Sequence, residues 1–262
     1  MKTKLVLCIL FLFSLVIFKN AFGDDFSDAI LKARKDFNAA SNKNDKDALL
    51  KVRGEFERIL QLKKNEWLVN YYLAHVDFML SYTGIVDGKP NDDVKKYTES
   101  SLKMLDKCTD MKDDFAEAYV LKMAVNSNRF MYEPDKLNNI IAKISENKER
   151  AMKLDPNNPR LYLIDGMNTY YTPEAFGGGA EKSLPMFQKS YDLFGTYKPA
   201  DDTYPNWGND LCAGMLALCD IKLGKLDEAK KYMDKGLEIN PDSGFIKGQV
   251  QKEYDDAVSK NK

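Results

Sequence analysis

The chain has 262 residues, of which 44% are hydrophobic and 30% are charged, and its formal net charge is −1. This composition excludes a collagen, a disordered acidic tail and a strongly basic nucleic-acid-binding protein. Because the sequence contains a single histidine, sites that need two or three imidazoles are excluded as well. We expect neither a metal site nor a bound cofactor.

The first residues have the pattern of a signal peptide. Lysines near the start precede an apolar run from Leu5 to Phe18, and small residues follow, ending at Gly23. The run has about 14 residues, fewer than the ~20 of a membrane-spanning α-helix, and small residues at this distance are typical of a cleavage site. We expect removal of residues 1–23 on export, leaving residues 24–262 as one domain without a stable membrane span. An uncleaved N-terminal anchor is the alternative.

Export would place the mature chain in the periplasm, or outside the cell if there is no outer membrane. Removal of residues 1–23 changes the net charge to about −4, which argues further against a nucleic-acid partner. Three cysteines remain, Cys108, Cys212 and Cys219. The last two stand on one expected helix with Cα atoms about 10 Å apart, too far for a disulfide. We therefore expect buried thiols.

Helical spacing of apolar residues continues along nearly the whole mature chain. It starts with Phe26, Ile30, Ala33 and Phe37, and no alternating strand pattern competes with it. Breakers rich in Asn, Gly and Pro separate the blocks. The spacing predicts eleven helices, mostly in pairs, near residues 26–37, 49–60, 66–82, 91–107, 115–130, 135–153, 159–171, 180–194, 208–223, 226–238 and 243–258.

The last helix pair carries the pattern of a known repeat. Small and large side chains follow one another in a fixed order, at Ala213, Leu216, Ala217, Leu223, Gly224, Leu226, Ala229, Met233, Gly236 and Pro241. The pattern resembles the tetratricopeptide (TPR) repeat, a helix–turn–helix unit of 34 residues. In that family, small positions let the two helices pack closely, and the terminal proline stops the second helix.

The resemblance covers most of residues 26–241, with one good repeat and about four weaker ones. Ala213, Ala217 and Asp220 depart from it, because the family usually has Trp, Gly and Tyr there. It implies an all-α, right-handed helical solenoid of about five helix hairpins with a C-terminal capping helix near residues 243–258. In such solenoids the inner surface of the curve, lined by the first helix of each hairpin, usually receives a partner segment.

Two segments fall outside the repeat pattern. One contains Tyr171 and the sequence Phe176-Gly177-Gly178-Gly179, and the other is Pro205-Asn206-Trp207-Gly208. Together they resemble uncharacterised exported bacterial TPR proteins, a resemblance that implies fold and compartment but no known activity. The chain is also similar, more loosely, to the periplasmic TPR component associated with some TRAP-type solute transporters.

The sequence offers no recognisable catalytic constellation. The glycine-rich segment does not fit a phosphate-binding loop, because Glu181 precedes Lys182 where that motif needs glycine. His75 has no histidine partner, and no nucleophile motif accompanies it. We expect His75 to be a packed or partly exposed helix residue and the protein to be no enzyme.

Aromatic residues gather between Tyr162 and Trp207, and four of them lie in or next to long loops. These four, Tyr171, Phe176, Tyr204 and Trp207, are our candidate partner-binding residues, because large aromatics in loops on a rigid scaffold are common at binding sites. The alternative is that they pack the two insertions against the helices.

The sequence therefore favours an exported, non-catalytic scaffold that binds a protein or peptide in the cell envelope. A small-molecule-binding accessory of a solute uptake system, with its pocket between the two insertions, is the alternative. Composition and motifs indicate no particular ligand and no particular oligomeric state.

Overall fold

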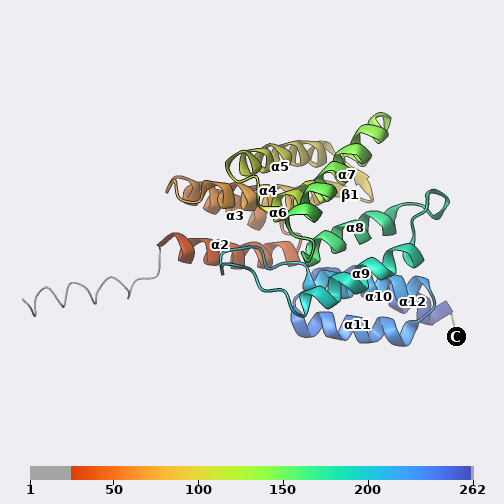
Figure 1. Cartoon of the computed structure of the whole chain (residues 1–262). Helices are drawn as coiled ribbons and strands as arrows, with labels where there is room; N and C mark the ends of the chain where they lie inside the picture. Colours follow the sequence, from red (N-terminus) through yellow and green to blue (C-terminus); the bar gives the residue numbers. More distant parts are fainter. Residues whose placement is uncertain (1–24, 261–262) are drawn as a thin grey trace, which may run out of the picture.

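The computed structural model describes residues 25–260, which form eleven α-helices and one very short β-hairpin (Figure 1). The α-helices are α2 (Asp25–Asn42), α3 (Lys46–Leu60), α4 (Glu66–Tyr82), α5 (Asp92–Met111), α6 (Ala116–Ser127), α7 (Leu137–Leu154), α8 (Pro159–Tyr171), α9 (Ala180–Phe194), α10 (Asn209–Lys222), α11 (Leu226–Ile239) and α12 (Gln251–Lys260). The predicted signal peptide, residues 1–23, lies outside the described residues.

Shorter elements fill the turns. They are the antiparallel strands β1 (Ile85–Val86) and β2 (Lys89–Pro90), the 3₁₀ turns η2 (Asn128–Met131), η3 (Pro134–Lys136) and η4 (Glu174–Phe176), and the π-helical turn η5 (Ile246–Val250). The β-hairpin and the π turn are differences from the prediction, which placed an unstructured turn and one continuous C-terminal helix there. Both are too short to alter the hydrophobic periodicity that the prediction used.

The helices pair into five hairpins, α2–α3, α4–α5, α6–α7, α8–α9 and α10–α11, and each hairpin lies against the next along the chain. The segment of η5 and α12 then packs on the last hairpin. The predicted fold class, an all-α solenoid of five hairpins with a C-terminal capping helix, is confirmed.

The two helices of a hairpin are buried to different extents. In α10 every residue from Cys212 to Ile221 is buried, whereas the buried residues of α11 are a single stripe of Ala229, Met233 and Gly236. An inner helix such as α10 touches its own partner and the neighbouring hairpins, so it has no free face. An outer helix needs only one apolar stripe, which is the pattern that sequence periodicity detects.

Small residues at the repeat positions allow close helix packing. A Cβ atom added at Gly236 would lie 3.2 Å from the Cβ of Ala213 and 2.3 Å from the side chain of Ile246. A Cβ at Gly166 would lie 2.7 Å from the ring of Phe187. These pairs explain why the α10–α11 and α8–α9 hairpins need small residues at these places.

The superhelix curves enough for its first and last hairpins to meet. The side-chain amide of Asn240 donates to Oδ1 of Asn42 at 3.1 Å, joining the end of α2 to the end of α11. Gly244 approaches α2 so closely that an added Cβ would lie 1.9 Å from the Asn42 carbonyl oxygen. The described solenoid therefore curves far enough for the end of α2 to touch the turn after α11.

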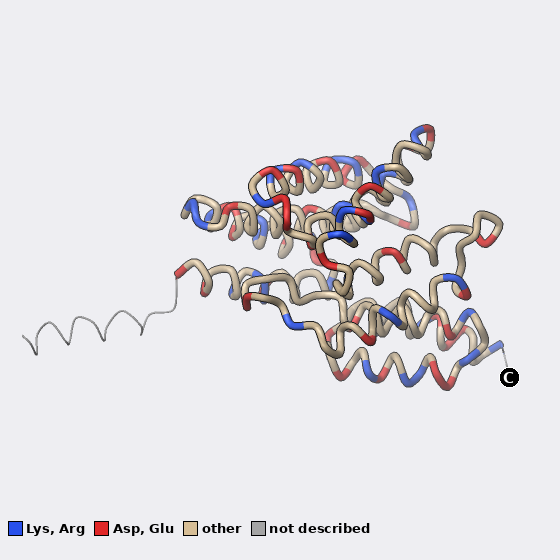
Figure 2. The backbone as a smooth tube through the Cα atoms, viewed as in Figure 1, with Lys and Arg blue, Asp and Glu red and all other residues tan. Residues whose placement is uncertain are grey.

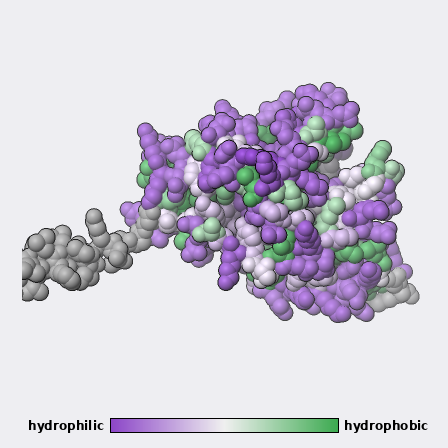
Figure 3. Space-filling view, in the orientation of Figure 1, coloured by the Kyte–Doolittle hydropathy of each residue, from purple (hydrophilic) through white to green (hydrophobic). Residues whose placement is uncertain are grey.

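The outer surface is polar and mixed in charge. Figure 2 shows basic and acidic residues interspersed along the outer helices, and Figure 3 shows hydrophilic side chains over most of the same face. Within residues 25–260, no helix combines the length and apolar character needed to cross a membrane.

The three cysteines within residues 25–260, Cys108, Cys212 and Cys219, are buried free thiols, as the sequence predicts. Burial raises the pKa of Cys108 and that of Cys212 to about 12. Thiols with such pKa values stay protonated at neutral pH, so these side chains act as small core residues.

Candidate partner-binding site

A segment of the chain itself occupies the inner surface of the solenoid. Residues 201–207, which we call the strap, belong to the connection between α9 and α10 and run alongside α2 (Figure 1). Thr203 and Pro205 in the strap are buried, while Asp201, Asp202 and Asn206 are exposed. The strap therefore covers inner surface that would otherwise be open to a partner.

Side chains from the first two hairpins bind the start of the strap through its main chain. The Arg34 guanidinium on α2 donates to the carbonyl oxygens of Asp202 and Tyr204, at 2.7 and 2.8 Å. The Tyr72 hydroxyl on α4 donates to the carbonyl oxygen of Thr203 at 2.6 Å. Burial raises the pKa of Tyr72 to about 12, so this hydroxyl remains a proton donor at neutral pH.

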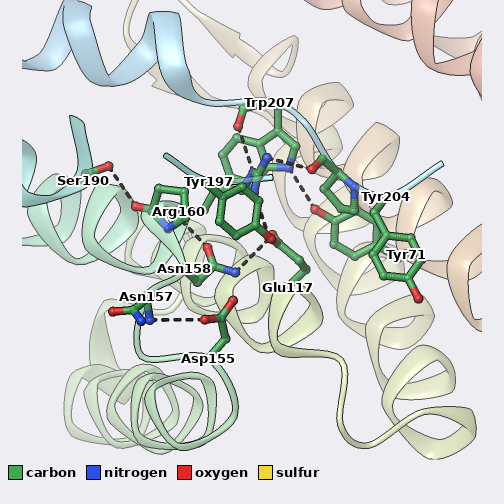
Figure 4. Close-up of polar contacts among 12 residues, drawn as sticks. Tyr71, Glu117, Asp155, Asn157, Asn158, Arg160, Ser190, Tyr197, Tyr204 and Trp207 are labelled. Atoms are coloured by element: carbon green, nitrogen blue, oxygen red, sulfur yellow. Dashed lines mark hydrogen bonds and ion pairs between the residues drawn. The ribbon is translucent and has the colours of Figure 1, made fainter. Parts of the chain in front are cut away.

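Arg160, on α8, binds the end of the strap. Its Nη2 and Nε atoms donate to the carbonyl oxygens of Pro205 and Trp207, both at 2.8 Å (Figure 4). Its Nη1 atom forms an ion pair with Glu117 Oε1 at 2.8 Å, and both side chains are almost completely buried. Because a buried charge is costly unless it is paired and hydrogen-bonded, this arrangement fixes the guanidinium firmly in place.

Glu117 has further donors around the same oxygen atom. The side-chain amide of Asn158 lies 2.8 Å and the hydroxyl of Tyr197 lies 3.3 Å from Oε1. Asn158 also accepts a hydrogen bond from the backbone N–H of Arg160, capping the start of α8. The ion pair thus belongs to a network that joins α6, α8 and the chain beyond α9.

The two strap aromatics pack into the interior. The ring of Tyr204 makes edge contacts with Trp67 and Phe115, with centroids 5.6 and 5.7 Å apart. The indole N–H of Trp207 donates to the Tyr71 hydroxyl at 2.9 Å, and the Trp207 ring lies 5.0 Å from that of His75. Tyr204 and Trp207 therefore hold the strap on the inner helices, in line with the alternative that the sequence left open.

His75 is a packed helix residue, as expected. It is 6% exposed and lies between the rings of Phe37 and Trp207. Burial, together with the positive charge of Arg160, lowers the pKa of His75 to about 3. The imidazole is therefore neutral at physiological pH.

The other two candidate residues lie elsewhere, at the end of α8. Residues 172–179 connect α8 to α9, and we call them the α8–α9 loop; they project at the right of Figure 1. Phe176 at its tip is 82% exposed, and Tyr171 just before it is 57% exposed. The structure therefore separates the four predicted residues into an interior pair, Tyr204 and Trp207, and an exposed pair, Tyr171 and Phe176.

Hydrogen bonds within the α8–α9 loop define its shape. Backbone N–H groups of Phe176 and Gly178 both donate to the Pro173 carbonyl, and that of Gly179 donates to the Thr169 carbonyl at 3.0 Å. A Cβ at Gly178 would lie 2.1 Å from the Thr172 carbonyl oxygen, so this close turn requires glycine. The glycines thus build a specific turn that presents Phe176 to solvent.

Further apolar groups are exposed on the same side of the molecule. The start of α7 projects at the upper right of Figure 1, and its residues Leu137 and Ile141 are about half exposed, at 51% and 48%. Figure 3 shows apolar surface at this edge on both sides of a notch between the upper part of the molecule and the α8–α9 loop. Exposed apolar groups gathered in this way are typical of an interaction surface.

Among residues 25–260, no group of three or more His, Cys, Asp or Glu side chains is arranged to hold a metal ion. The buried network around Arg160 and Glu117 does not meet solvent as a catalytic cleft would, because the strap covers it.

Comparison with known proteins agrees with this architecture. No family model and no curated protein matches the sequence. Among solved structures, the HusA haemophore from Porphyromonas gingivalis is similar with a TM-score of 0.59 at 23% sequence identity, over 71% of this chain and 94% of that chain. A thermophilic TPR protein in Thermus thermophilus is similar with a TM-score of 0.56 at 15% identity, over 86% of this chain and 98% of that chain. The fold is TPR-like.

Sequence reasoning missed the residues that hold the strap. These residues come from four helices far apart in the chain, so no local sequence motif joins them. They are Arg34, Tyr72, Glu117 and Arg160. One signal was present, because Glu117 and Arg160 each interrupt a helix start that is otherwise apolar. A charged residue at such a buried position indicates a buried partner.

Proposed function

We propose that this protein is an exported, non-catalytic TPR-like scaffold that binds a protein partner through the α8–α9 loop. The observation that carries the proposal is the 82% exposure of Phe176 on a turn whose shape is set by its own hydrogen bonds. A large apolar side chain on a preformed backbone turn gains contact area on binding without the entropy cost of ordering the loop. Residues of this kind commonly supply much of the binding energy at protein interfaces.

The exposed loop is a better candidate than the inner surface near α2 and α4. Inner surface there is already filled by the strap, with Tyr204 and Trp207 packed against aromatic side chains of α4 and its neighbours. A partner at that place would first have to displace these contacts, whereas Phe176 is already exposed and can be contacted without any rearrangement.

The partner surface should offer an apolar pocket for Phe176 within a polar rim. Tyr171 and Pro173 are exposed next to the turn and Glu174 adds a carboxylate, so the surface combines an apolar centre with a charged group. This combination is typical of the core and rim of protein interfaces. Export rests on the apolar run from Leu5 to Phe18 and the small residues that end at Gly23, and the partner is accordingly expected in the cell envelope.

Site-specific photo-cross-linking tests the proposal directly. A photoreactive phenylalanine analogue placed at position 176, in the organism that makes the protein, should give a discrete adduct with one envelope protein. The same analogue at position 62 is the matched control, because Leu62 is also an exposed apolar residue, at 55%, in the turn after α3. Equal adducts from both positions, or an adduct with lipid only, would reject a protein partner at the loop.

A second candidate is a small apolar ligand near the same end of the inner helices. Tyr170 and Tyr171 contact each other with ring centroids 5.1 Å apart, and burial together with the neighbouring Tyr171 phenol raises the pKa of Tyr82. The electrostatic influence of Tyr171 on Tyr82 places these two phenols near one another, and the similar HusA protein is described as a haemophore. Haem titration followed by absorbance separates the candidates: a saturable shift that Tyr171→Phe weakens favours the ligand, and no shift favours the protein partner.

A further inference from the structure

The strap is bound in the way that a peptide-binding groove binds a peptide. Side chains of the surrounding helices donate hydrogen bonds to five main-chain carbonyls of the strap. These are the carbonyls of Asp202, Thr203, Tyr204, Pro205 and Trp207. The donors come from three hairpins, since Arg34 is on α2, Tyr72 on α4 and Arg160 on α8. Contacts to main-chain atoms recognise an extended backbone and leave the identity of most side chains free.

Much of the groove is held by contacts that do not involve the strap. The Arg160 guanidinium is paired with Glu117, and Asn158 donates to the same carboxylate. Its aromatic wall, which includes Tyr71 and Phe115, belongs to α4 and to the start of α6. The groove is therefore built by the repeats, and the strap is what fills it.

The strap is held mainly by side chains of the surrounding helices, and its own hydrogen bonds are confined to one short turn at Asp201. The connection from Gly195 to Gly208 contains no helix or strand. Within the strap the Asp201 carbonyl accepts from the backbone N–H of Tyr204, and Asp201 Oδ1 accepts from the backbone N–H and the hydroxyl of Thr203. Asp201, Asp202 and Asn206 are exposed at its outer side. Detachment would thus break side-chain contacts without unwinding a helix.

We propose that the strap is a resident peptide that closes this groove in cis, and that an extended segment of a partner protein with an aromatic pair spaced like Tyr204 and Trp207 can replace it. The partner segment would present its carbonyls to Arg34, Tyr72 and Arg160 and its two aromatic rings to the inner helices. This site is distinct from the α8–α9 loop, and the proposal does not depend on the function of that loop.

Because the strap occupies the groove, a partner segment must exceed a minimum affinity to replace it. A tethered segment competes at an effective concentration of about 1 mM, so the groove of the natural chain rejects weak binders. Weakening the strap should open the groove to segments that the natural chain excludes.

A thiol in the strap measures whether it detaches while the solenoid stays folded. Thr203→Cys places a thiol at a buried strap position, in exchange for the Thr203 methyl and the hydroxyl that donates to Asp201 Oδ1, and Cys108, Cys212 and Cys219 are internal references for opening of the core. In native buffer, alkylation at position 203 should be at least tenfold faster than at the three reference thiols. Equal rates would show that the strap leaves only when the whole protein unfolds, which would overturn the proposal.

Peptide binding supplies the second test. A fluorescent peptide with the sequence of residues 201–208 should bind saturably to the Tyr204→Ala/Trp207→Ala variant and at least tenfold more weakly to the natural chain. A peptide with both aromatics replaced by alanine is the control, and adding Arg34→Ala to the variant should weaken binding. Absence of binding to the variant, or loss of its helical circular dichroism, would contradict the proposal, because a replaceable segment must be dispensable for folding.

Discussion

The Arg160 guanidinium lies 2.8 Å from the Glu117 carboxylate, with exposed fractions of 1% and 5% for the two side chains. This ion pair joins α6 to α8, and the same guanidinium donates to two strap carbonyls. One arginine therefore links the repeat scaffold to the segment that covers its inner face.

Breaking this ion pair should destabilise the protein strongly. We expect Arg160→Met to lower the free energy of unfolding by about 3–5 kcal/mol, because Glu117 would remain buried without its cation. Glu117→Leu in the same background should restore part of the loss, since the double variant has no unpaired charge. Urea denaturation of the single and double variants measures both effects, and additive losses would show that the two side chains do not act as a pair.

The buried His75 should make stability depend on pH. Its pKa is about 3 in the folded protein, lowered by burial and by Arg160, against about 6.5 when unfolded. As the pH falls, the imidazole is therefore protonated in the unfolded chain before it is protonated in the folded chain. The free energy of unfolding is then unaffected by protonation of His75 above pH 6.5 and decreases as the pH falls from 6.5 toward 3. Between pH 7 and pH 5, the natural chain should lose about 2 kcal/mol more than His75→Phe. Parallel pH profiles for the two proteins would contradict this assignment.

The hydrogen bond between Trp207 and Tyr71 should be measurable by a double-mutant cycle. Trp207→Phe removes the donor and Tyr71→Phe removes the acceptor of the 2.9 Å contact. Each single change should cost about 1–3 kcal/mol, because it leaves a buried polar group without its partner, and the coupling energy should be about 1 kcal/mol. A coupling energy of zero would indicate that the indole packs in the strap without a significant hydrogen bond.

The shape of the α8–α9 loop should depend on Gly178. In Gly178→Ala the added Cβ would meet the Thr172 carbonyl at 2.1 Å, so the turn must change and Phe176 must move. We expect partner affinity to fall at least tenfold while the helical circular dichroism stays unchanged. Gly248→Ala, in η5, is the control for substitution of a glycine, because an added Cβ there meets nothing within 4 Å and the backbone is not left-handed. Full affinity in Gly178→Ala would argue against a preformed turn.

Helix positions and the repeat class were predictable because they depend on short-range periodicity. In α11 the apolar stripe of Ala229, Met233 and Gly236 recurs at helical spacing, and Gly236 marks the close approach to α10. In each hairpin, the spacing of apolar residues along the sequence indicates which helix face is buried. The family resemblance then supplied the way in which hairpins stack.

The path of the strap was not predictable in the same way. Its hydrogen bonds join residues far apart in the sequence, such as Arg34 to Tyr204 and Tyr72 to Thr203. An exposed loop aromatic and a buried one look alike in a sequence, so Trp207 and Phe176 were placed in one candidate site. The curvature of the solenoid, which brings α2 to the last hairpin, decides which of the two is buried.

The central claim is that a protein partner binds the α8–α9 loop. The most direct test is to measure the affinity of the purified partner for the Phe176→Ala variant and for the Leu62→Ala variant. Both changes remove an exposed apolar side chain, but only the first removes the tip of the α8–α9 loop. We predict at least a tenfold higher Kd for Phe176→Ala, about 1.4 kcal/mol or more, and a Kd within twofold of the natural protein for Leu62→Ala. An unchanged Kd for Phe176→Ala would contradict the account.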